Sequence, residues 1–179
     1  ILFTSGTEGD PKGVVLSHKN IVANIHQILA HVPEALGLDD VLFNPLPTFH
    51  CFGLTAGALL PLLGGMKSVL HPSPLQTKII PKRVEETGAT ILFATDTFLN
   101  QYIRACQGNE LGKLRFAVCG AERVRDETRQ LVRKRFDVEL LEGYGATEAS
   151  PVIAVNQPSR NRPGTVGRPL PGMELKFEP

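Results

Sequence analysis

The ten-residue segment 4–13, Thr-Ser-Gly-Thr-Glu-Gly-Asp-Pro-Lys-Gly, combines the residue types that bind phosphate groups. Its glycines let the backbone turn and let the N–H groups approach an anion closely. Its hydroxyl groups add hydrogen-bond donors, and its lysine adds a positive charge suited to a polyphosphate. Because apolar residues 1–3 and 14–16 flank the segment, we expect a strand, a phosphate-binding turn and a returning strand. The candidate phosphate-binding residues are Thr4, Ser5, Gly6, Thr7, Gly9 and Lys12.

The spacing within this segment excludes two other nucleotide-binding loops. A P-loop requires G-x-x-x-x-G-K-[ST], whereas here Pro11 precedes the lysine and Gly13 follows it. A dinucleotide-binding loop leads into a helix, but a strand is expected here. The pattern T-S-G-T-x-G-x-P-K-G instead resembles the phosphate loop of the adenylate-forming superfamily, which includes acyl-CoA synthetases, peptide-synthetase adenylation domains and luciferases. Glu8 replaces the usual threonine, so its carboxylate must face solvent, a magnesium ion or Lys12 to avoid repelling a triphosphate.

Apolar strand patterns alternate with helical patterns along the rest of the chain. This alternation predicts an α/β fold with a mostly parallel sheet and helices on both faces. The resemblance identifies it as a fragment of the large N-terminal domain of an adenylate-forming enzyme. The predicted strands are 41–43, 66–70, 90–94, 114–118 and 138–142, and the predicted helices are 20–32, 53–63, 78–86, 98–106 and 126–136.

The two ends of the sequence both have strand-like patterns that look cut. We therefore expect residues 1–179 to be a truncated piece of an AMP-binding (adenylation) domain. The proline- and glycine-rich run that begins at Pro158 reads as a linker, and we expect residues 158–179 to begin a separate small β subdomain. The alternating residues 173–178 favour a further strand there.

Three segments follow predicted strands, where ligands of parallel α/β sheets bind: residues 43–50, 120–122 and 143–148. Each resembles a further motif of the superfamily, in the same order. The last contains Y-G-x-T-E, which joins an aromatic face for a purine, a glycine for close approach, a hydroxyl for a phosphate and a carboxylate for Mg²⁺. The resemblance implies that Tyr144 stacks on adenine beside Gly145, that Thr147 contacts the α-phosphate and that Glu148 holds the metal.

The other two motifs give further site candidates. Gly120, Ala121 and Glu122 resemble the segment that lines the adenine and substrate pocket, although a solvated glutamate opening a turn is an alternative for Glu122. His50 resembles the residue that gates the acyl site, with an ordinary structural histidine as the alternative. The resemblance thus implies catalytic roles for Lys12, His50, Thr147 and Glu148, with ATP and Mg²⁺ as cofactors.

Composition narrows the class of protein. The chain has a net charge of +1, so its overall charge does not indicate binding to nucleic acid. The three cysteines are widely spaced and lack a C-x-x-C pattern, which argues for a reducing compartment and against a zinc site. No stretch has the apolar length of a transmembrane segment.

The resemblance implies ATP-dependent activation of a fatty acid to an acyl-adenylate, followed by transfer to a thiol. Residues 72–75, 97–99 and 142–144, with the glutamate in the phosphate loop, look like one branch: the bacterial bifunctional acyl-acyl-carrier-protein synthetase/2-acylglycerophosphoethanolamine acyltransferase. That branch implies acyl carrier protein as acceptor, a role in phospholipid metabolism and a cytoplasmic-side, membrane-associated parent. A long-chain acyl-CoA ligase, with coenzyme A as acceptor, and an inactive binding module are the alternatives.

Two further expectations concern the substrates. We expect the acyl chain to contact apolar residues of stretches 49–63 and 93–98, so that a large residue at Gly53 would shorten the preferred chain. Arg125, Arg129 and Arg133 recur every four residues, which places them on one helical face. Such a basic face could guide an acidic carrier protein, or it could be an ordinary solvated surface.

Overall fold

The computed structural model describes residues 1–4 and 10–176 of the chain. Its centre is a seven-stranded sheet in the order β4-β3-β5-β6-β7-β8-β9. Strands β3 to β7 run parallel, and β8 and β9 are antiparallel additions at one edge. The predicted mostly parallel sheet is therefore confirmed. The strands are β3 (Val41–Asn44), β4 (Lys67–Leu70), β5 (Ile91–Ala94), β6 (Phe116–Cys119), β7 (Glu139–Gly145), β8 (Val152–Val155) and β9 (Arg168–Pro169).

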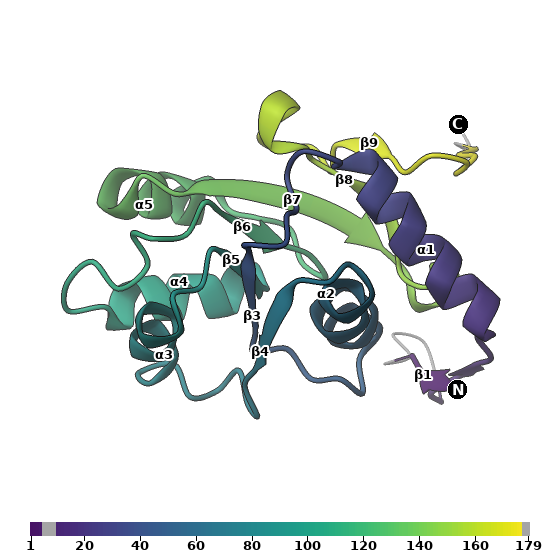
Figure 1. Cartoon of the computed structure of the whole chain (residues 1–179), viewed down its shortest axis with the longest axis horizontal. Coiled ribbons are helices and arrows are strands. Elements are labelled where there is room, and N and C mark those ends of the chain that lie inside the picture. The colour runs from purple at the N-terminus through teal and green to yellow at the C-terminus, as the bar shows by residue number, and fades with distance from the viewer. Residues whose placement is uncertain (5–9, 177–179) are drawn as a thin grey trace.

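Helices cover both faces of the sheet, as expected, and form two separate hydrophobic cores (Figure 1). The three helices on one face bury apolar residues such as Leu99, Ile103 and Val132 against the sheet. On the other face, Ile25 and Leu60 belong to the second core. The first group comprises α3 (Ile80–Thr87), α4 (Asp96–Ala105) and α5 (Asp126–Phe136), and the second comprises α1 (His18–His31), the π-helical segment η1 (Phe52–Leu59) and α2 (Leu60–Leu63).

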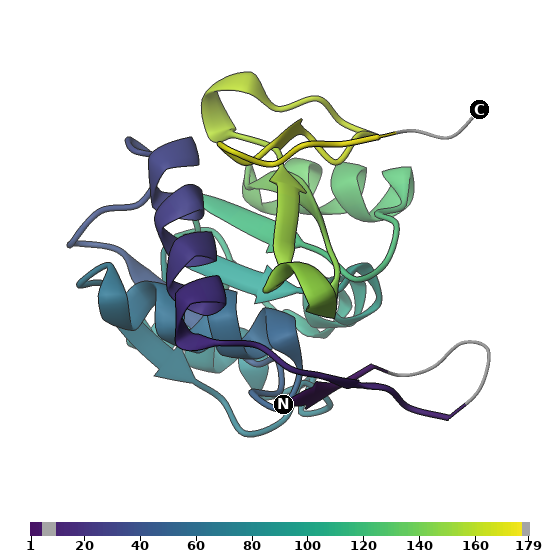
Figure 2. The same ribbon diagram turned by 90° about the vertical axis from the view of Figure 1, so that its right-hand side faces the viewer.

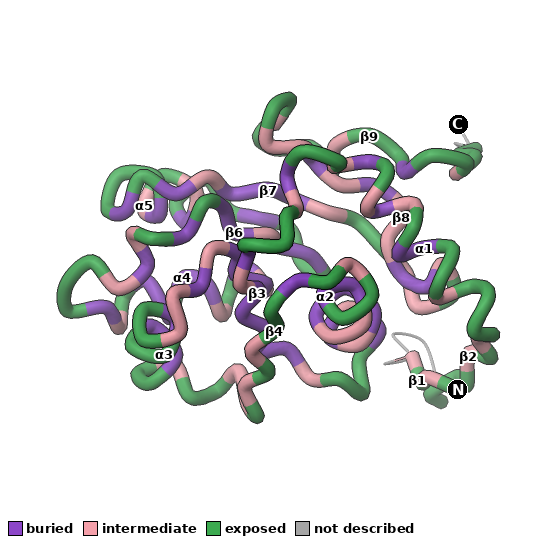
Figure 3. Tube along the Cα trace, in the orientation of Figure 1, coloured by how far each residue is buried: buried purple, intermediate pink, exposed green. Residues whose placement is uncertain are grey.

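Burial follows this layering (Figure 3). The central strands β3, β5 and β6 are almost entirely buried, which explains why their sequences are continuous apolar runs rather than alternating patterns. Helix α5 instead exposes most of its charged residues and buries Thr128, Val132 and Phe136. No helix among the described residues is long and apolar enough to cross a membrane.

Local signals explain where the helices begin. Ser17 accepts a hydrogen bond from the backbone of Asn20, and the Asn20 side chain accepts one from Ser17 in return, so this capping box begins α1. Helix α4 begins at Asp96 rather than at Phe98, because the Thr95 hydroxyl caps it. The expected helix 53–63 is mainly π-helical, with only its last turn in α geometry.

The C-terminal segment differs from the expected alternating strand. Residues 173–176 are not a strand, and β9 instead pairs with β8 earlier in the segment. Leu170, directly after β9, is buried in the core beneath α1. That residues 158–179 begin a separate subdomain stays a prediction.

Strands β1 (Leu2–Phe3) and β2 (Gly13–Val14) form a small antiparallel hairpin of their own. Leu2 pairs with Val14 and Phe3 with Gly13, which agrees with the strand, turn and returning strand expected around the phosphate-binding segment. Figure 2 shows this hairpin extending from the start of α1, away from the main sheet.

Candidate active site

The hairpin fixes the two ends of the candidate phosphate loop. The Thr4 backbone N–H donates to the carbonyl oxygen of Lys12 at 2.9 Å, and the Lys12 N–H donates to Thr4 Oγ1 at 3.3 Å. These contacts close the loop at its stem and leave Lys12 solvent-exposed. The other predicted phosphate-binding residues, Ser5, Gly6, Thr7 and Gly9, lie outside the described residues.

The Y-G-x-T-E motif lies where the carboxyl end of β7 turns toward β8. Tyr144 is the penultimate residue of β7, and the residue is 54% exposed. Gly145 follows at an irregularity in the strand pairing, where an added Cβ would come within 2.4 Å of the Pro151 carbonyl oxygen. Only glycine allows this close approach. Thr147 and Glu148 lie in the short helix that follows, and Glu148 is exposed.

The segment 120–122 lies at the carboxyl end of the adjacent strand, β6. Gly120 and Ala121 line a cavity, and Ala121 has a left-handed backbone with φ of 69°. Such strain in a non-glycine residue is concentrated at functional sites. Glu122 does not line the cavity. Its carboxylate accepts hydrogen bonds from the Thr97 hydroxyl at 2.7 Å and from the Thr97 backbone at 3.4 Å, which attaches this loop to the start of α4.

His50 and Thr147, 97 positions apart in the sequence, are connected through Cys51. The sulfur of Cys51 lies 3.5 Å from Thr147 Oγ1 and 4.0 Å from His50 Nδ1. His50 Nδ1 also accepts a hydrogen bond from the Phe52 backbone N–H at 3.2 Å. Sequence reasoning missed Cys51, because nothing in a lone cysteine next to a histidine indicates a partner almost a hundred residues away.

Electrostatics distinguish Cys51 from the other cysteines. Burial favours its neutral thiol, but contacts with His50 and Thr147 outweigh burial and lower the pKa of Cys51. The same contact with Cys51 raises the pKa of His50, against the opposing effect of burial. In contrast, burial raises the pKa of Cys106 to about 12 and raises the pKa of Cys119 well above its usual value.

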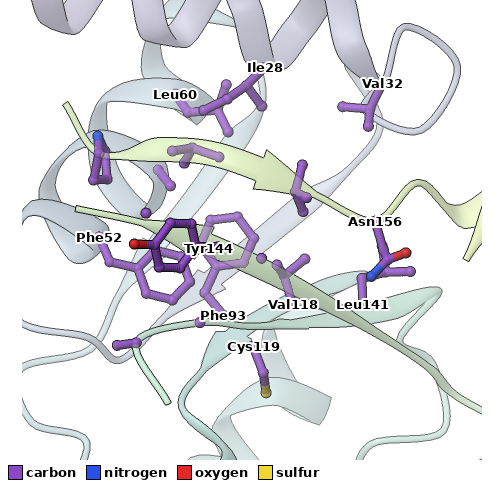
Figure 4. Close-up of a pocket in the computed structure, with 18 of the residues that line it drawn as sticks. Ile28, Val32, Phe52, Leu60, Phe93, Val118, Cys119, Leu141, Tyr144 and Asn156 are labelled. Carbon is purple, nitrogen blue, oxygen red and sulfur yellow. The ribbon is translucent and has the colours of Figure 1, made fainter. Parts of the chain in front are cut away.

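An apolar cavity of about 110 Å³ runs from this cluster between the sheet and the helices α1 and η1. Figure 4 shows the rings of Tyr144, Phe52 and Phe93 at one end and Val32 and Asn156 at the other. The rings of Phe52 and Phe93 stack with their centroids 5.4 Å apart. The expected stretches 49–63 and 93–98 supply part of the lining. Gly120, Ala121 and Tyr144, which the sequence analysis named as site residues, also line it. The contributions of α1, of residues 35–36 and of β8 were not indicated by the sequence.

The expectation for Gly53 is wrong. Gly53 is buried against the preceding loop rather than along the cavity, and an added Cβ would lie 2.2 Å from the Pro47 carbonyl oxygen. A larger residue there would displace backbone instead of shortening a pocket.

We therefore expect Gly53→Ala to lower the free energy of unfolding by about 1–3 kcal/mol, the range typical of overpacked cores. Gly37→Ala is the matched control, because its Cβ would meet only Asp40 Oδ2 at 3.8 Å. Urea unfolding measures both variants. Equal stability of the two would show that the close contact at Gly53 is relieved without cost.

The expected basic stripe on α5 is a free surface only in part. Arg129 is largely buried and forms an ion pair with Glu142, and Arg125 and Arg133 pair with Asp96 and Asp137. Each of the three guanidinium groups thus has a carboxylate partner, and the side chains of Arg125 and Arg133 remain more than half exposed. That this face guides an acidic carrier protein stays a prediction.

The donor set fits a magnesium ion held jointly with a substrate. Among residues 1–4 and 10–176 no group of three or more His, Cys, Asp or Glu side chains could hold a metal alone. Mg²⁺ typically uses one or two carboxylates and completes its shell with water and substrate phosphates. The exposed Glu148, next to Thr147, offers one such carboxylate.

The chain resembles known ligases over almost its whole length. The long-chain-fatty-acid–CoA ligase of Bacillus subtilis (strain 168) is 32% identical over 178 residues, which cover 96% of this chain and 31% of the relative. The crystal structure of the anthranilate CoA ligase AuaEII in complex with anthranoyl-AMP superposes with a TM-score of 0.87 at 25% identity, covering 98% of this chain and 34% of that one. ATP-bound MatB from Rhodopseudomonas palustris superposes with a TM-score of 0.80 at 28% identity, covering 96% and 33%.

The sequence matches the AMP-binding enzyme family over residues 1–178, so the chain belongs to that family. Its fold is that of the N-terminal domain of adenylate-forming enzymes. The chain spans about a third of the length of the relatives that it matches.

Proposed function

We propose that the full-length protein activates a fatty acid with ATP and then transfers the acyl group to a thiol. The observation that carries this proposal is the apolar cavity that ends at the nucleotide motif, between Tyr144, Gly120 and His50. An apolar channel suits an alkyl chain, and polar groups at its mouth suit a carboxylate and a phosphate. The fatty-acid–CoA ligase relative and the anthranoyl-AMP complex support the same chemistry.

In the first step, a carboxylate oxygen of the fatty acid bonds to the α-phosphorus of ATP. The bond from that phosphorus to the bridging oxygen breaks, and pyrophosphate leaves with the electron pair. We propose that Lys12 and Thr147 stabilise the negative charge on the phosphates, while Tyr144 stacks on adenine. Mg²⁺ bound at Glu148 would neutralise further phosphate charge.

In the second step, the sulfur of a thiol bonds to the acyl carbon and the bond from that carbon to AMP breaks. The thiol proton is released to solvent. We place His50, which is exposed at the mouth of the cavity, as the gate between the adenylate and the acyl site. Gly120 and Ala121 line the wall, and Glu122 holds their loop against α4.

Two versions of this proposal differ in the thiol that accepts the acyl group. In the first version, acyl carrier protein is the acceptor, in a membrane-associated system on the cytoplasmic side that reacylates lysophospholipid. This version rests on the resemblance of residues 72–75, 97–99 and 142–144 to the acyl-acyl-carrier-protein synthetase branch. Coenzyme A is supported equally well by the fatty-acid–CoA ligase relative. Purified full-length protein with ATP, Mg²⁺ and a fatty acid, supplied with each thiol separately, decides between them. Faster acyl transfer to coenzyme A would contradict the carrier-protein version, and no transfer to either would contradict both.

Val118, in the middle of β6, offers a test of the acyl site because it lines the cavity. We expect Val118→Phe to shift the preferred fatty acid to shorter chains, because the ring fills part of a cavity of only about 110 Å³. Val118→Ala enlarges the same space and is expected to shift the preference to longer chains. Adenylation rates with fatty acids of increasing length measure both variants. The same chain-length profile in both would place the acyl chain elsewhere.

A further inference from the structure

Cys51 connects two parts of the site that lie far apart in the sequence. It immediately precedes η1, whereas Thr147 begins the short helix after β7, 96 residues later. The Cys51 side chain is buried at 5% exposure and lines the acyl cavity. The direct contact between its sulfur and Thr147 Oγ1, at 3.5 Å, therefore links the acyl cavity to the nucleotide motif.

Backbone hydrogen bonds hold both partners in place. The His50 N–H donates to the Pro47 carbonyl at 3.1 Å, and the Leu54 N–H donates to the His50 carbonyl at 2.9 Å, which fixes the start of η1. On the other side, the Ser150 N–H donates to the Thr147 carbonyl at 3.2 Å. The side chains of Cys51 and Thr147 therefore meet from two stretches of backbone that are both held by hydrogen bonds.

The contact allows two directions, because either the Cys51 thiol or the Thr147 hydroxyl can donate. A neutral histidine that accepts at Nδ1 carries its proton on Nε2, and His50 Nδ1 already accepts from the Phe52 N–H. The Cys51 sulfur lies closer to Thr147 Oγ1, at 3.5 Å, than to His50 Nδ1, at 4.0 Å. When a phosphate accepts the Thr147 proton, the hydroxyl can no longer donate to the sulfur, so in that state the thiol is the donor and Thr147 Oγ1 is its nearer acceptor.

We propose that Cys51 is a positioning residue that donates its Sγ–H to Thr147 Oγ1, so that the Thr147 hydroxyl directs its own proton to the α-phosphate of ATP. This inference rests on the proposed role of Thr147. A hydroxyl that accepts one hydrogen bond has its remaining donor direction restricted, and such preorganisation favours the transition state over the bound substrate. Loss of the thiol should then reduce kcat rather than raise KM.

The experiment measures fatty-acid-dependent ATP–pyrophosphate exchange by the full-length protein. Cys51→Val keeps an apolar side chain of similar size but removes the donor, and we expect kcat to fall about tenfold with KM for ATP within twofold. Cys51→Ser restores a donor and is expected to recover at least half of the original kcat. Cys106→Ala is the control, because Cys106 donates to the Tyr102 carbonyl within α4 and does not line the cavity.

A double variant separates positioning from general damage. If Cys51 acts through Thr147, Thr147→Val with Cys51→Val should be no slower than Thr147→Val alone, because the two residues act as a unit. Thermal unfolding of each variant, with Cys51→Ala as a second donor-free substitution, checks that the fold is retained. Unchanged kcat in both donor-free variants, a Cys51→Ser variant as slow as Cys51→Val, or additive losses in the double variant would overturn the proposal. Absence of exchange in the unsubstituted protein would instead contradict the proposed function, and full exchange in Thr147→Val would contradict the role of Thr147 and this proposal with it.

Discussion

Glu148→Gln in the full-length protein is expected to lower ATP–pyrophosphate exchange by at least about 100-fold, within the range seen when one preorganised charge contact is removed from an active site. The substitution keeps the shape of the side chain but removes the negative charge that a magnesium ion requires. Because Glu148 is exposed and the described structure gives its carboxylate no partner whose loss would unfold the chain, stability should hardly change.

Two controls make this result specific. Glu127→Gln removes an exposed carboxylate of α5 that pairs with Arg104 of α4. Exchange by this variant should stay within twofold of the original rate. Raising the Mg²⁺ concentration should restore part of the activity of Glu148→Gln, since a weakened metal site is filled again by mass action. Near-native exchange at ordinary Mg²⁺ would show that Glu148 does not hold the metal.

Arg129→Met is expected to destabilise the chain by about 3 kcal/mol or more, the cost of leaving a buried charge without its partner. Arg129 and Glu142 are 15% and 9% exposed at their side chains, and Arg129 also donates to the Leu140 carbonyl at 3.1 Å. Glu142 in turn accepts from the Gly164 N–H at 2.9 Å. The pair thus joins α5, β7 and the proline-rich segment, and Glu142 lies two residues before Tyr144.

Arg133→Met provides the matched control on the same helix. Its ion pair with Asp137 is solvent-exposed, so we expect a change below about 0.5 kcal/mol. Arg129→Met combined with Glu142→Leu should recover part of the lost stability, because neither charge is then left buried and alone. Urea unfolding measures all three proteins. Equal stabilities of Arg129→Met and Arg133→Met would show that the buried pair contributes no more than a surface one.

The sequence was sufficient for the five parallel strands, because buried parallel strands are encoded locally, but it did not indicate β8 or β9. Continuous apolar runs such as Ile91–Ala94 mark buried parallel strands whatever lies around them. A turn motif such as 143–148 carries its own chemistry in adjacent residues. The phosphate hairpin was likewise predictable from the residues that flank it.

The contacts that the sequence did not reveal all join distant segments. Charged residues on a helix usually face solvent, so nothing indicated that Arg129 would meet a glutamate buried in β7. The side-chain amide of Asn24 in α1 hydrogen-bonds both backbone groups of Val152, which holds α1 over the apolar cavity. Nothing in the sequence around either residue indicates this contact. Gly53 was misassigned because its packing partner, the Pro47 carbonyl, is a backbone group with no sequence signature.

The central claim is that this chain carries the nucleotide and acyl sites of a carboxylate-activating enzyme, and ATP–pyrophosphate exchange by the full-length protein tests it most directly. Labelled pyrophosphate should enter ATP only when a fatty acid and Mg²⁺ are present, and Lys12→Ala should reduce the rate sharply while leaving the fold intact. Exchange that does not depend on the fatty acid, or no exchange with fatty acids of any length, would contradict the account.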